Sequence, residues 1–548
     1  MKNKNVMKKS NFMQGAFIAT LGIVITKILG ILYVIPFYAI IGEKGGALYG
    51  YAYTFYLVFM AISTAGIPLA ISKLVSEYQT LGYYDAKERV FKICKIISVS
   101  LGILCFLILF IFAPQIAHAV LGNLKGGNTI EDVTFVIRVI STAIIIVPVL
   151  SVYRGYFEGH KFITPTAISQ VVEQVIRVLV IVLGSFMTLS IFKLSLTTAV
   201  GVAVFGATAG SLISYFYLIN KKRENKKKFL EKEKSVKEPV ITNKEILKKI
   251  FIYAFPLIMI DIFKSLYSFI DTVTVVKTLG AIYDTKTAES VMSIISTWAA
   301  KFNMIIISIA TGLIISLTPN LTSSFVLEDY DDVRKKINQS FQILAILIIP
   351  MTIGLSILAD PVYTVFYGHS NLGPKVFSVY IFVALIMAFY TTAVTIVQVL
   401  KDYKTVFISL FTGVLLKTLL NVYLMNLFNN ISLPAYYGSI AATIIGYGVS
   451  LIICMVALSR RFGVNYKETL KELIYILIAS FVMIISLKLL NIVVPIVVAN
   501  RFLNILIIVI YTLVGGLVYF LITYKTKTIE NVFGKSILNK IKKRLILK

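Results

Sequence analysis

Five basic residues lie near the middle of long apolar segments of the chain: Lys27, Arg177, Lys264, Lys301 and Lys417. A charge at the centre of a membrane helix costs about 2.5–3.5 kcal/mol on insertion scales, so each residue is expected to face protein or a watery cavity. Ammonium and guanidinium groups in such a cavity suit the recognition of a phosphate or diphosphate. For any single lysine the alternative is structural, with the ammonium group donating to carbonyl groups between helices.

Acidic residues in the apolar segments are fewer, namely Glu173, Asp261 and Asp271. Glu173 lies four residues before Arg177, and Asp261 lies three residues before Lys264, and both spacings allow ion pairs on one helical face. Even with both pairs formed, the other basic residues outnumber Asp271. The sequence therefore predicts a cationic cavity that holds an anion. The three carboxylates are also candidates for binding a coupling Na⁺ or H⁺, and the membrane potential is the alternative energy source.

A second candidate site lies at the end of the fourth apolar segment, where Arg154 and Glu158 are four residues apart. One interpretation is an ion pair at a helix end that contributes little to stability. The other is a gate or an entry site for a head group, next to Gly155 and Gly159. Lys73 ends the second apolar segment and can reach the aqueous boundary, which makes it a third candidate at this entrance.

Metal and cofactor chemistry is not indicated. The three histidines, His118, His160 and His369, are scattered without the spacing of metal ligands. No cofactor is predicted.

The composition requires a membrane around these residues. Of 548 residues, 58% are hydrophobic and 15% are charged, with a mean hydropathy of +0.86. Soluble chains have about 45–50% apolar and about 25% charged residues, so a soluble or disordered protein is excluded. Fourteen segments are long and apolar enough to cross a bilayer, at 15–41, 48–76, 92–113, 133–153, 163–188, 195–219, 250–277, 291–318, 337–358, 376–400, 405–425, 435–458, 472–488 and 502–524. We predict an all-α integral membrane protein with fourteen transmembrane helices.

The basic residues are distributed unevenly between the two sides of this predicted topology. Lysine and arginine total 54 against 26 acidic residues, a net charge of +28 that in a soluble protein would suggest nucleic acid. The loops on the side of the two termini hold 37 of the lysine and arginine residues, and the loops on the opposite side hold 8. This bias predicts cytoplasmic N- and C-termini and removes the argument for a nucleic-acid partner.

The chain divides into two similar halves. A basic stretch, 221–249, separates a predicted N-lobe at 1–220 from a C-lobe at 250–458, and residues 459–548 add two helices and a basic tail. The halves match at an offset near 245, with Lys27 over Lys264 in their first segments. We predict two six-helix bundles related by a pseudo-two-fold axis along the membrane normal, an arrangement common in transporters.

Several stretches match a known superfamily: Thr26–Gly30, Gly66–Lys73, Tyr153–His160 and Pro165–Arg177. The chain resembles the MOP superfamily of exporters, most closely the Gram-positive branch of polysaccharide biosynthesis proteins with stage V sporulation protein B and the lipid II flippases. The resemblance implies a flippase of the bacterial cell membrane that carries an undecaprenyl-pyrophosphate-linked cell-wall precursor outwards, in peptidoglycan biosynthesis or in sporulation. It further implies two lobes that give alternating access to a cationic cavity, and a lipid-tail groove beside the last two helices.

The match to the family's charged residues is partial. Lys27 and Lys301 take the places of two family arginines. An Arg-Asp pair of the better-known lipid II flippases falls on Tyr33 and Val34, which favours the sporulation-type branch.

Two other functions compete with a flippase. An enzyme acting on lipid-linked sugars would need a catalytic cluster, and the only suggestive string, 329–332, suits a helix start better. A multidrug or cation antiporter, or a flippase for another lipid-linked polysaccharide unit, would share the architecture. Cation export favours an acidic cavity, whereas this cavity is predicted to be cationic.

Overall fold

The computed structural model describes residues 22, 25–64, 66–230, 239–496 and 500–533. Within these residues every regular element is a helix and none is a strand, which confirms the all-α class. The chain forms two compact units, Met1–Ser296 (unit 1) and Thr297–Lys548 (unit 2).

Unit 1 contains α2 (Val34–Thr64), α3 (Ile67–Leu81), α4 (Tyr84–Ile111), α5 (Ala113–Leu121), α6 (Ile130–Gly159), α7 (Ile163–Leu179), two π-helical segments η1 (Val180–Gly184) and η2 (Met187–Ile191), α8 (Leu196–Glu224), α9 (Lys226–Leu230), α10 (Asn243–Ile282) and α11 (Thr285–Ser293). A further π-helical segment, η3 (Ile294–Trp298), crosses the boundary between the units.

Twelve helical stretches in the described residues are long and apolar enough to cross a membrane. They correspond to the predicted segments two to six and eight to fourteen. Most of the first predicted segment, 15–41, lies outside the described residues. The seventh corresponds to α10, which carries Asp261, Lys264 and Asp271 and is not among the twelve. The count of fourteen therefore stays a prediction.

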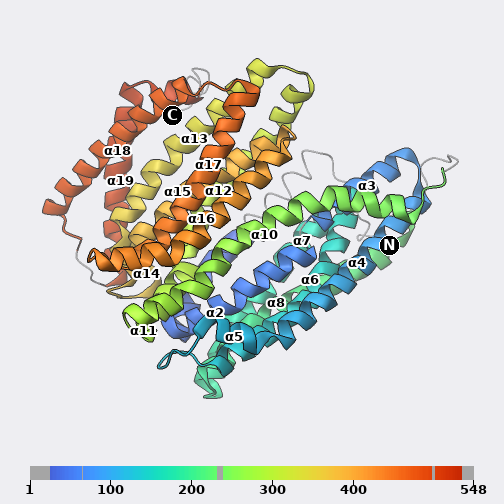
Figure 1. The fold of residues 1–548 in the computed structure, drawn as a ribbon, viewed down its shortest axis with the longest axis horizontal. Coiled ribbons are helices and arrows are strands. Elements are labelled where there is room, and N and C mark those ends of the chain that lie inside the picture. The colour runs from blue at the N-terminus through green and yellow to red at the C-terminus, as the bar shows by residue number, and fades with distance from the viewer. Residues whose placement is uncertain (1–21, 23–24, 65, 231–238, 497–499, 534–548) are drawn as a thin grey trace, which may run out of the picture. The chain divides into compact units, whose positions relative to one another are not determined.

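α10 packs within unit 1, along α2, α3, α5 and α11 (Figure 1). The sequence repeat instead makes it the first helix of the second bundle, and the repeat and its domain boundaries remain predictions. The helix is interrupted next to Gly66 and Pro68, because α2 ends at Thr64 and α3 begins at Ile67. Gly66 has a φ of +74°, and a Cβ there would lie 2.6 Å from the carbonyl oxygen of Ala254 on α10. Only glycine suits both the left-handed backbone and this close approach.

A buried carboxylate fastens α11 to the rest of unit 1. Glu289 is 3% exposed and accepts hydrogen bonds from the Asn128 backbone N–H (2.9 Å) and side-chain amide (3.0 Å). The same amide donates to the carbonyl of Lys44. Directly after Asn128, Thr129 and Asp132 form a capping box that starts α6. The loop before α6 thus holds α11 through a fully buried glutamate.

Unit 2 contains α12 (Ala299–Val326), α13 (Tyr330–Ile357), α14 (Ala359–Tyr367), α15 (Gly373–Val399), α16 (Tyr403–Asn430), α17 (Tyr436–Phe462), α18 (Lys467–Val493), α19 (Arg501–Lys525) and α20 (Thr528–Phe533).

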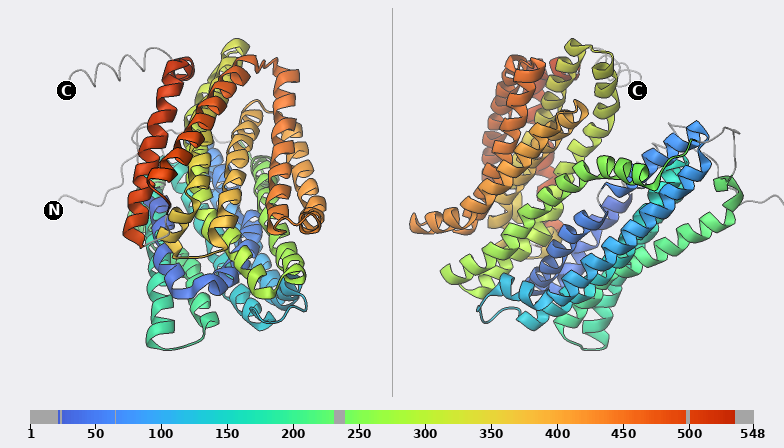
Figure 2. Two further views of the ribbon diagram at one scale, coloured as in Figure 1. Left: turned by 90° about the vertical axis from the view of Figure 1, so that its left-hand side faces the viewer. Right: turned by 45° about the vertical axis from the view of Figure 1, so that its right-hand side comes forward.

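Unit 2 contains two closely packed helix pairs. α16 and α17 pack against each other, and α18 and α19 form a second pair beside α13 and α14 (Figure 2). The α18–α19 pair exposes large apolar side chains such as Phe481, Leu513 and Phe520. Such an apolar outer surface is expected where helices face lipid.

Candidate functional site

An ionic cluster joins three helices of unit 1 around Glu173 on α7. One carboxylate oxygen of Glu173 lies 2.8 Å from Nη2 of Arg154 on α6, and the other lies 2.5 Å from Nη2 of Arg177. The side chains are 12–21% exposed. The predicted pairing of Glu173 with Arg177 is confirmed. With two guanidinium groups on one carboxylate, the cluster carries a net positive charge.

Serine hydroxyls complete the surroundings of Arg154. Its Nε donates to Ser169 Oγ at 2.9 Å, and its Nη2 also donates to Ser214 Oγ on α8 at 3.2 Å. Arg177 is less well satisfied, because its buried Nε has no hydrogen-bond partner. A buried donor without a partner is costly, which makes this guanidinium ready to accept an anionic ligand.

Small residues allow α8 to approach this cluster closely. A Cβ at Gly210 would lie 2.5 Å from the Glu173 carbonyl oxygen, and one at Gly206 would lie 3.0 Å from that of Arg177. Glycines four residues apart are typical of tightly packed membrane helices. The approach brings Ser214 within reach of Arg154.

A row of tyrosines on α2 lies near Arg177. Tyr49, Tyr53 and Tyr56 share one helical face, with the first two rings stacked at 4.4 Å and the second pair edge to face at 5.6 Å. The hydroxyl of Tyr33, at the start of the row, lies 3.5 Å from that of Tyr49. All three α2 tyrosines interact electrostatically with Arg177. The spacing of four and three residues in the sequence places the three rings on one helical face, a signal from which this row could have been predicted.

Two of the predicted cavity lysines form no direct ion pair with a residue that the structure describes. Neither Lys27 nor Lys264 forms an ion pair or a hydrogen bond with any residue that the structure describes. Lys264 interacts electrostatically with Asp261, but the expected ion pair is absent from the described residues. Lys27 lies on helical residues 25–32. This stretch lies close to α7, since a Cβ at Gly30 would be 3.6 Å from the side-chain amide of Gln174. Both lysines are half-buried.

Lys417 has a different environment from these two. It has no exposed surface, and its ammonium group donates to Asn421 Oδ1 (2.9 Å), the Ser439 carbonyl (3.0 Å) and Thr443 Oγ1 (2.6 Å). These neutral acceptors lie on α16 and α17. The geometry favours the structural alternative for Lys417, in which the ammonium group joins two helices.

A Lys417→Met variant tests this assignment. It leaves the three acceptors without their donor, so we expect a loss of about 1–3 kcal/mol in stability. Transport per folded molecule should stay within about twofold of the parent, since the side chain has no surface for a ligand. Thermal unfolding of the purified protein and a flipping assay normalised to folded protein check both parts. A stable variant that has lost transport would return Lys417 to the cavity.

Two further candidate residues are half-buried: Lys301 on α12 and Asp271 on α10.

At the predicted entrance, the basic residues contact other partners than expected. Arg154 pairs with Glu173, and within the described residues no ion pair joins it to Glu158. The carboxylate that pairs with Arg154 therefore lies on the neighbouring helix α7, and not four residues further along α6. Ser169 and Ser214 hold the guanidinium group on the side of this neighbouring helix. Lys73 places its ammonium 3.9 Å from the centre of the Tyr253 ring on α10.

α3 and α10 are also joined by an ion pair near Lys73. Glu77 lies 2.8 Å from Lys249, which precedes the predicted membrane segment 250–277. The hydrogen bond that the Lys249 ammonium group donates to the Glu77 carboxylate raises the pKa of Lys249. Lys249 therefore stays protonated at neutral pH.

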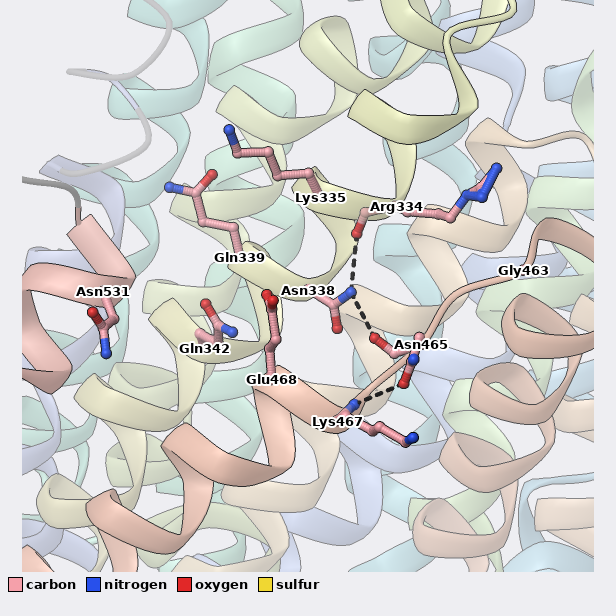
Figure 3. A pocket seen from close by; sticks show the side chains of 10 residues that line it. All are labelled: Arg334, Lys335, Asn338, Gln339, Gln342, Gly463, Asn465, Lys467, Glu468 and Asn531. Carbon is pink, nitrogen blue, oxygen red and sulfur yellow. Dashed lines mark hydrogen bonds between the residues drawn. The ribbon is translucent and has the colours of Figure 1, made fainter.

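A polar pocket of about 760 Å³ lies in unit 2, between the start of α13, the turn before α18, and α20 (Figure 3). Asn338 bridges its wall by donating to the carbonyls of Arg334 (3.2 Å) and Asn465 (3.0 Å). Asn465 in turn accepts from the Lys467 backbone. These bonds fix the α17–α18 turn to α13, and the sequence analysis did not anticipate them because amide side chains carry no periodic signal.

The comparisons with known proteins agree along the chain. A family described as polysaccharide biosynthesis protein matches residues 12–285. The chain is 33% identical to the lipid II flippase MurJ of Bacillus subtilis (strain 168) over 538 residues, 96% of this chain and 97% of the relative. It is 28% identical to stage V sporulation protein B of the same organism over 212 residues, 39% of each chain. The departures at Tyr33 and Val34 therefore do not set the chain apart from the lipid II flippases.

Two solved structures share the fold. Lipid II flippase MurJ in an inward closed conformation has a TM-score of 0.63 and 15% identity, covering 93% of this chain and 99% of that one. An inward-facing MATE family multidrug transporter has a TM-score of 0.62 and 14% identity, covering 81% and 98%. The chain therefore belongs to the polysaccharide biosynthesis protein family, and its relative over nearly the whole length is a flippase, which is a membrane transporter and not an enzyme.

Proposed function

We propose that this chain is a flippase that moves an undecaprenyl-pyrophosphate-linked cell-wall precursor, similar to lipid II, from the inner to the outer leaflet by alternating access. The observation that carries the proposal is the 33% identity to a lipid II flippase over 96% of the chain. The charge of the site supports it. Unpaired ammonium groups and a net-positive arginine cluster suit a diphosphate, which must exchange its hydration for cations on entering a membrane.

We assign the head group to Lys27, Lys264, Lys301 and Arg177, and the entrance to Arg154, Glu158 and Lys73. Glu173, Asp261 and Asp271 are the candidates for a coupling Na⁺ or H⁺. The lipid tail stays in the bilayer beside α18 and α19, whose apolar side chains are exposed. The 37-to-8 distribution of basic residues supports cytoplasmic termini and entry from the inner leaflet.

Loss of a cavity lysine is expected to stop transport while sparing the fold. Hydrogen bonds to charged groups contribute about 1.5–3 kcal/mol, so Lys27→Ala or Lys301→Ala should slow flipping at least about tenfold. The assay measures the exposure of labelled lipid II at the outer face of vesicles that contain the purified protein. Lys286→Ala, at an exposed position outside the predicted segments, is the matched control. Unchanged flipping in both cavity variants at equal protein levels would remove the cavity from the mechanism.

The choice of substrate has its own test. The same vesicles are loaded with lipid II or with one of two other undecaprenyl-linked sugars, and initial rates are compared. A preference for lipid II supports a role in peptidoglycan synthesis. Faster transport of another glycan makes the protein a flippase for a different polysaccharide unit.

A multidrug antiporter is the second candidate, because the MATE fold is equally similar. Overexpression that confers drug resistance, lost in Asp271→Asn, would support it. Resistance unaffected by this substitution, together with lipid II transport, supports the flippase.

A further inference from the structure

A pocket of about 460 Å³ lies where α4, α6 and α8 meet in unit 1. Four basic residues line it: Lys95 on α4, Lys222 and Arg223 at the end of α8, and Lys226 on α9. Two tyrosine rings, Tyr153 and Tyr215, form the wall between them and meet edge to face at 5.4 Å. None of these residues takes part in the Glu173 cluster.

No acidic residue lines this pocket. Within the described part of the chain, none of the four basic side chains forms an ion pair. The carboxylate that acts electrostatically on Lys222 is that of Glu88, which accepts a hydrogen bond from the Tyr156 hydroxyl. Four like charges around one hollow repel each other, so an anion that enters it is stabilised by all four.

Aromatic rings fix the innermost cation. The ammonium group of Lys222 lies 3.5 Å from the centre of the Phe91 ring and 4.4 Å from that of Tyr156. Ring faces attract a cation and also keep water away from one side of it. Lys222 is therefore held in place and partly desolvated, which strengthens its attraction for an anion.

The helices that carry the basic residues also carry apolar side chains. Ile219 lines the pocket itself. Ile96, next to Lys95, is 65% exposed, and Phe216, next to Tyr215, is 53% exposed. Both lie on helices long and apolar enough to cross a membrane, at the ends that the charge distribution assigns to the cytoplasm. A ligand in the pocket would thus meet the cations and Ile219, and an apolar tail leaving it would meet apolar side chains exposed on the same helices.

We propose that this pocket binds the phosphate group of an anionic phospholipid from the leaflet that these helix ends face. Basic pockets between membrane helices on the cytoplasmic side are suited to lipid head groups. The apolar surface beside the cations accounts for a lipid better than for free phosphate. The site is separate from the proposed transport function, since it uses none of the residues assigned to the transported head group.

The test compares two double variants of the full chain that lose the same charge. Lys222→Gln with Arg223→Gln empties the pocket of two cations, whereas Lys244→Gln with Lys248→Gln removes two exposed cations from α10. Native mass spectrometry of the purified protein measures bound phosphatidylglycerol, with phosphatidylethanolamine and inorganic phosphate as the comparison probes. Since each basic residue near a charged lipid surface contributes about fivefold in affinity, the pocket variant should bind phosphatidylglycerol at least about tenfold more weakly.

The α10 variant should retain binding, and both variants should keep the elution profile of the parent. Equal phosphatidylglycerol binding by the two variants would overturn the proposal, as would equal retention of phosphatidylethanolamine by the parent. Saturation of the pocket by inorganic phosphate would reassign it to a soluble anion. Displacement of phosphatidylglycerol by an equal amount of undecaprenyl pyrophosphate would make it part of the transport route. Loss of lipid binding with normal flipping separates this site from the transport site.

Discussion

A Glu173→Ala variant is expected to lose about 3–5 kcal/mol of stability, because the change leaves two buried guanidinium groups without their shared carboxylate. Arg154 and Arg177 would then face each other across a space with few acceptors. Thermal unfolding in detergent measures the loss, and flipping of lipid II should fall with it. Glu131→Ala, which removes an exposed carboxylate at the start of α6, is the matched control and should change stability by about 0.5 kcal/mol or less.

The same cluster allows a rescue experiment. Glu173→Met combined with Arg177→Met removes the carboxylate and one of its two cations, so a single buried charge, that of Arg154, is left to satisfy. This double variant should be more stable than Glu173→Ala, since replacing a buried ion pair by apolar groups is often neutral or favourable. A Glu173→Ala protein as stable as the control would show that the carboxylate is not holding the arginines.

Gly155→Val is the second change with a large expected effect. A Cβ at Gly155 would overlap the Ile71 side chain and the Pro68 carbonyl oxygen of α3. A backbone oxygen cannot move aside as a flexible side chain can, so overpacking here should cost about 3 kcal/mol or more. We expect little monodisperse protein by size-exclusion chromatography after extraction.

The control for this prediction is Gly354→Val on α13, where a Cβ would have no neighbour within 4 Å. It should behave as the parent does. Equal yields of the two variants would mean that α3 and α6 separate easily at Gly155, in keeping with a moving entrance and not with a fixed contact.

The sequence predicted best what depends on local pattern. Hydropathy located the helices, and the four-residue spacing of Glu173 and Arg177 identified a real ion pair. In these cases the physical cause acts within one or two helical turns.

The sequence failed where the partner comes from another helix. Arg154 forms its ion pair with Glu173 on α7 and two serines complete the site, whereas Glu158 on its own helix interacts with it only electrostatically. For Lys417 the sequence left a cavity role and a structural role open, because its acceptors on α17 are neutral groups without periodic spacing. Such contacts form where two helices approach each other closely, as at Gly210. No spacing rule within one helix predicts these approaches.

The bonds of Lys417 constrain how the protein is made. Two of the three acceptors of its ammonium group belong to α17, which follows α16 after a connection of only five residues. If α16 left the translocon alone, the ammonium group would enter hydrocarbon without its two acceptors on α17, and a charge there costs about 2.5–3.5 kcal/mol. The two helices are therefore expected to partition into lipid together, as a hairpin already closed around its charge during synthesis.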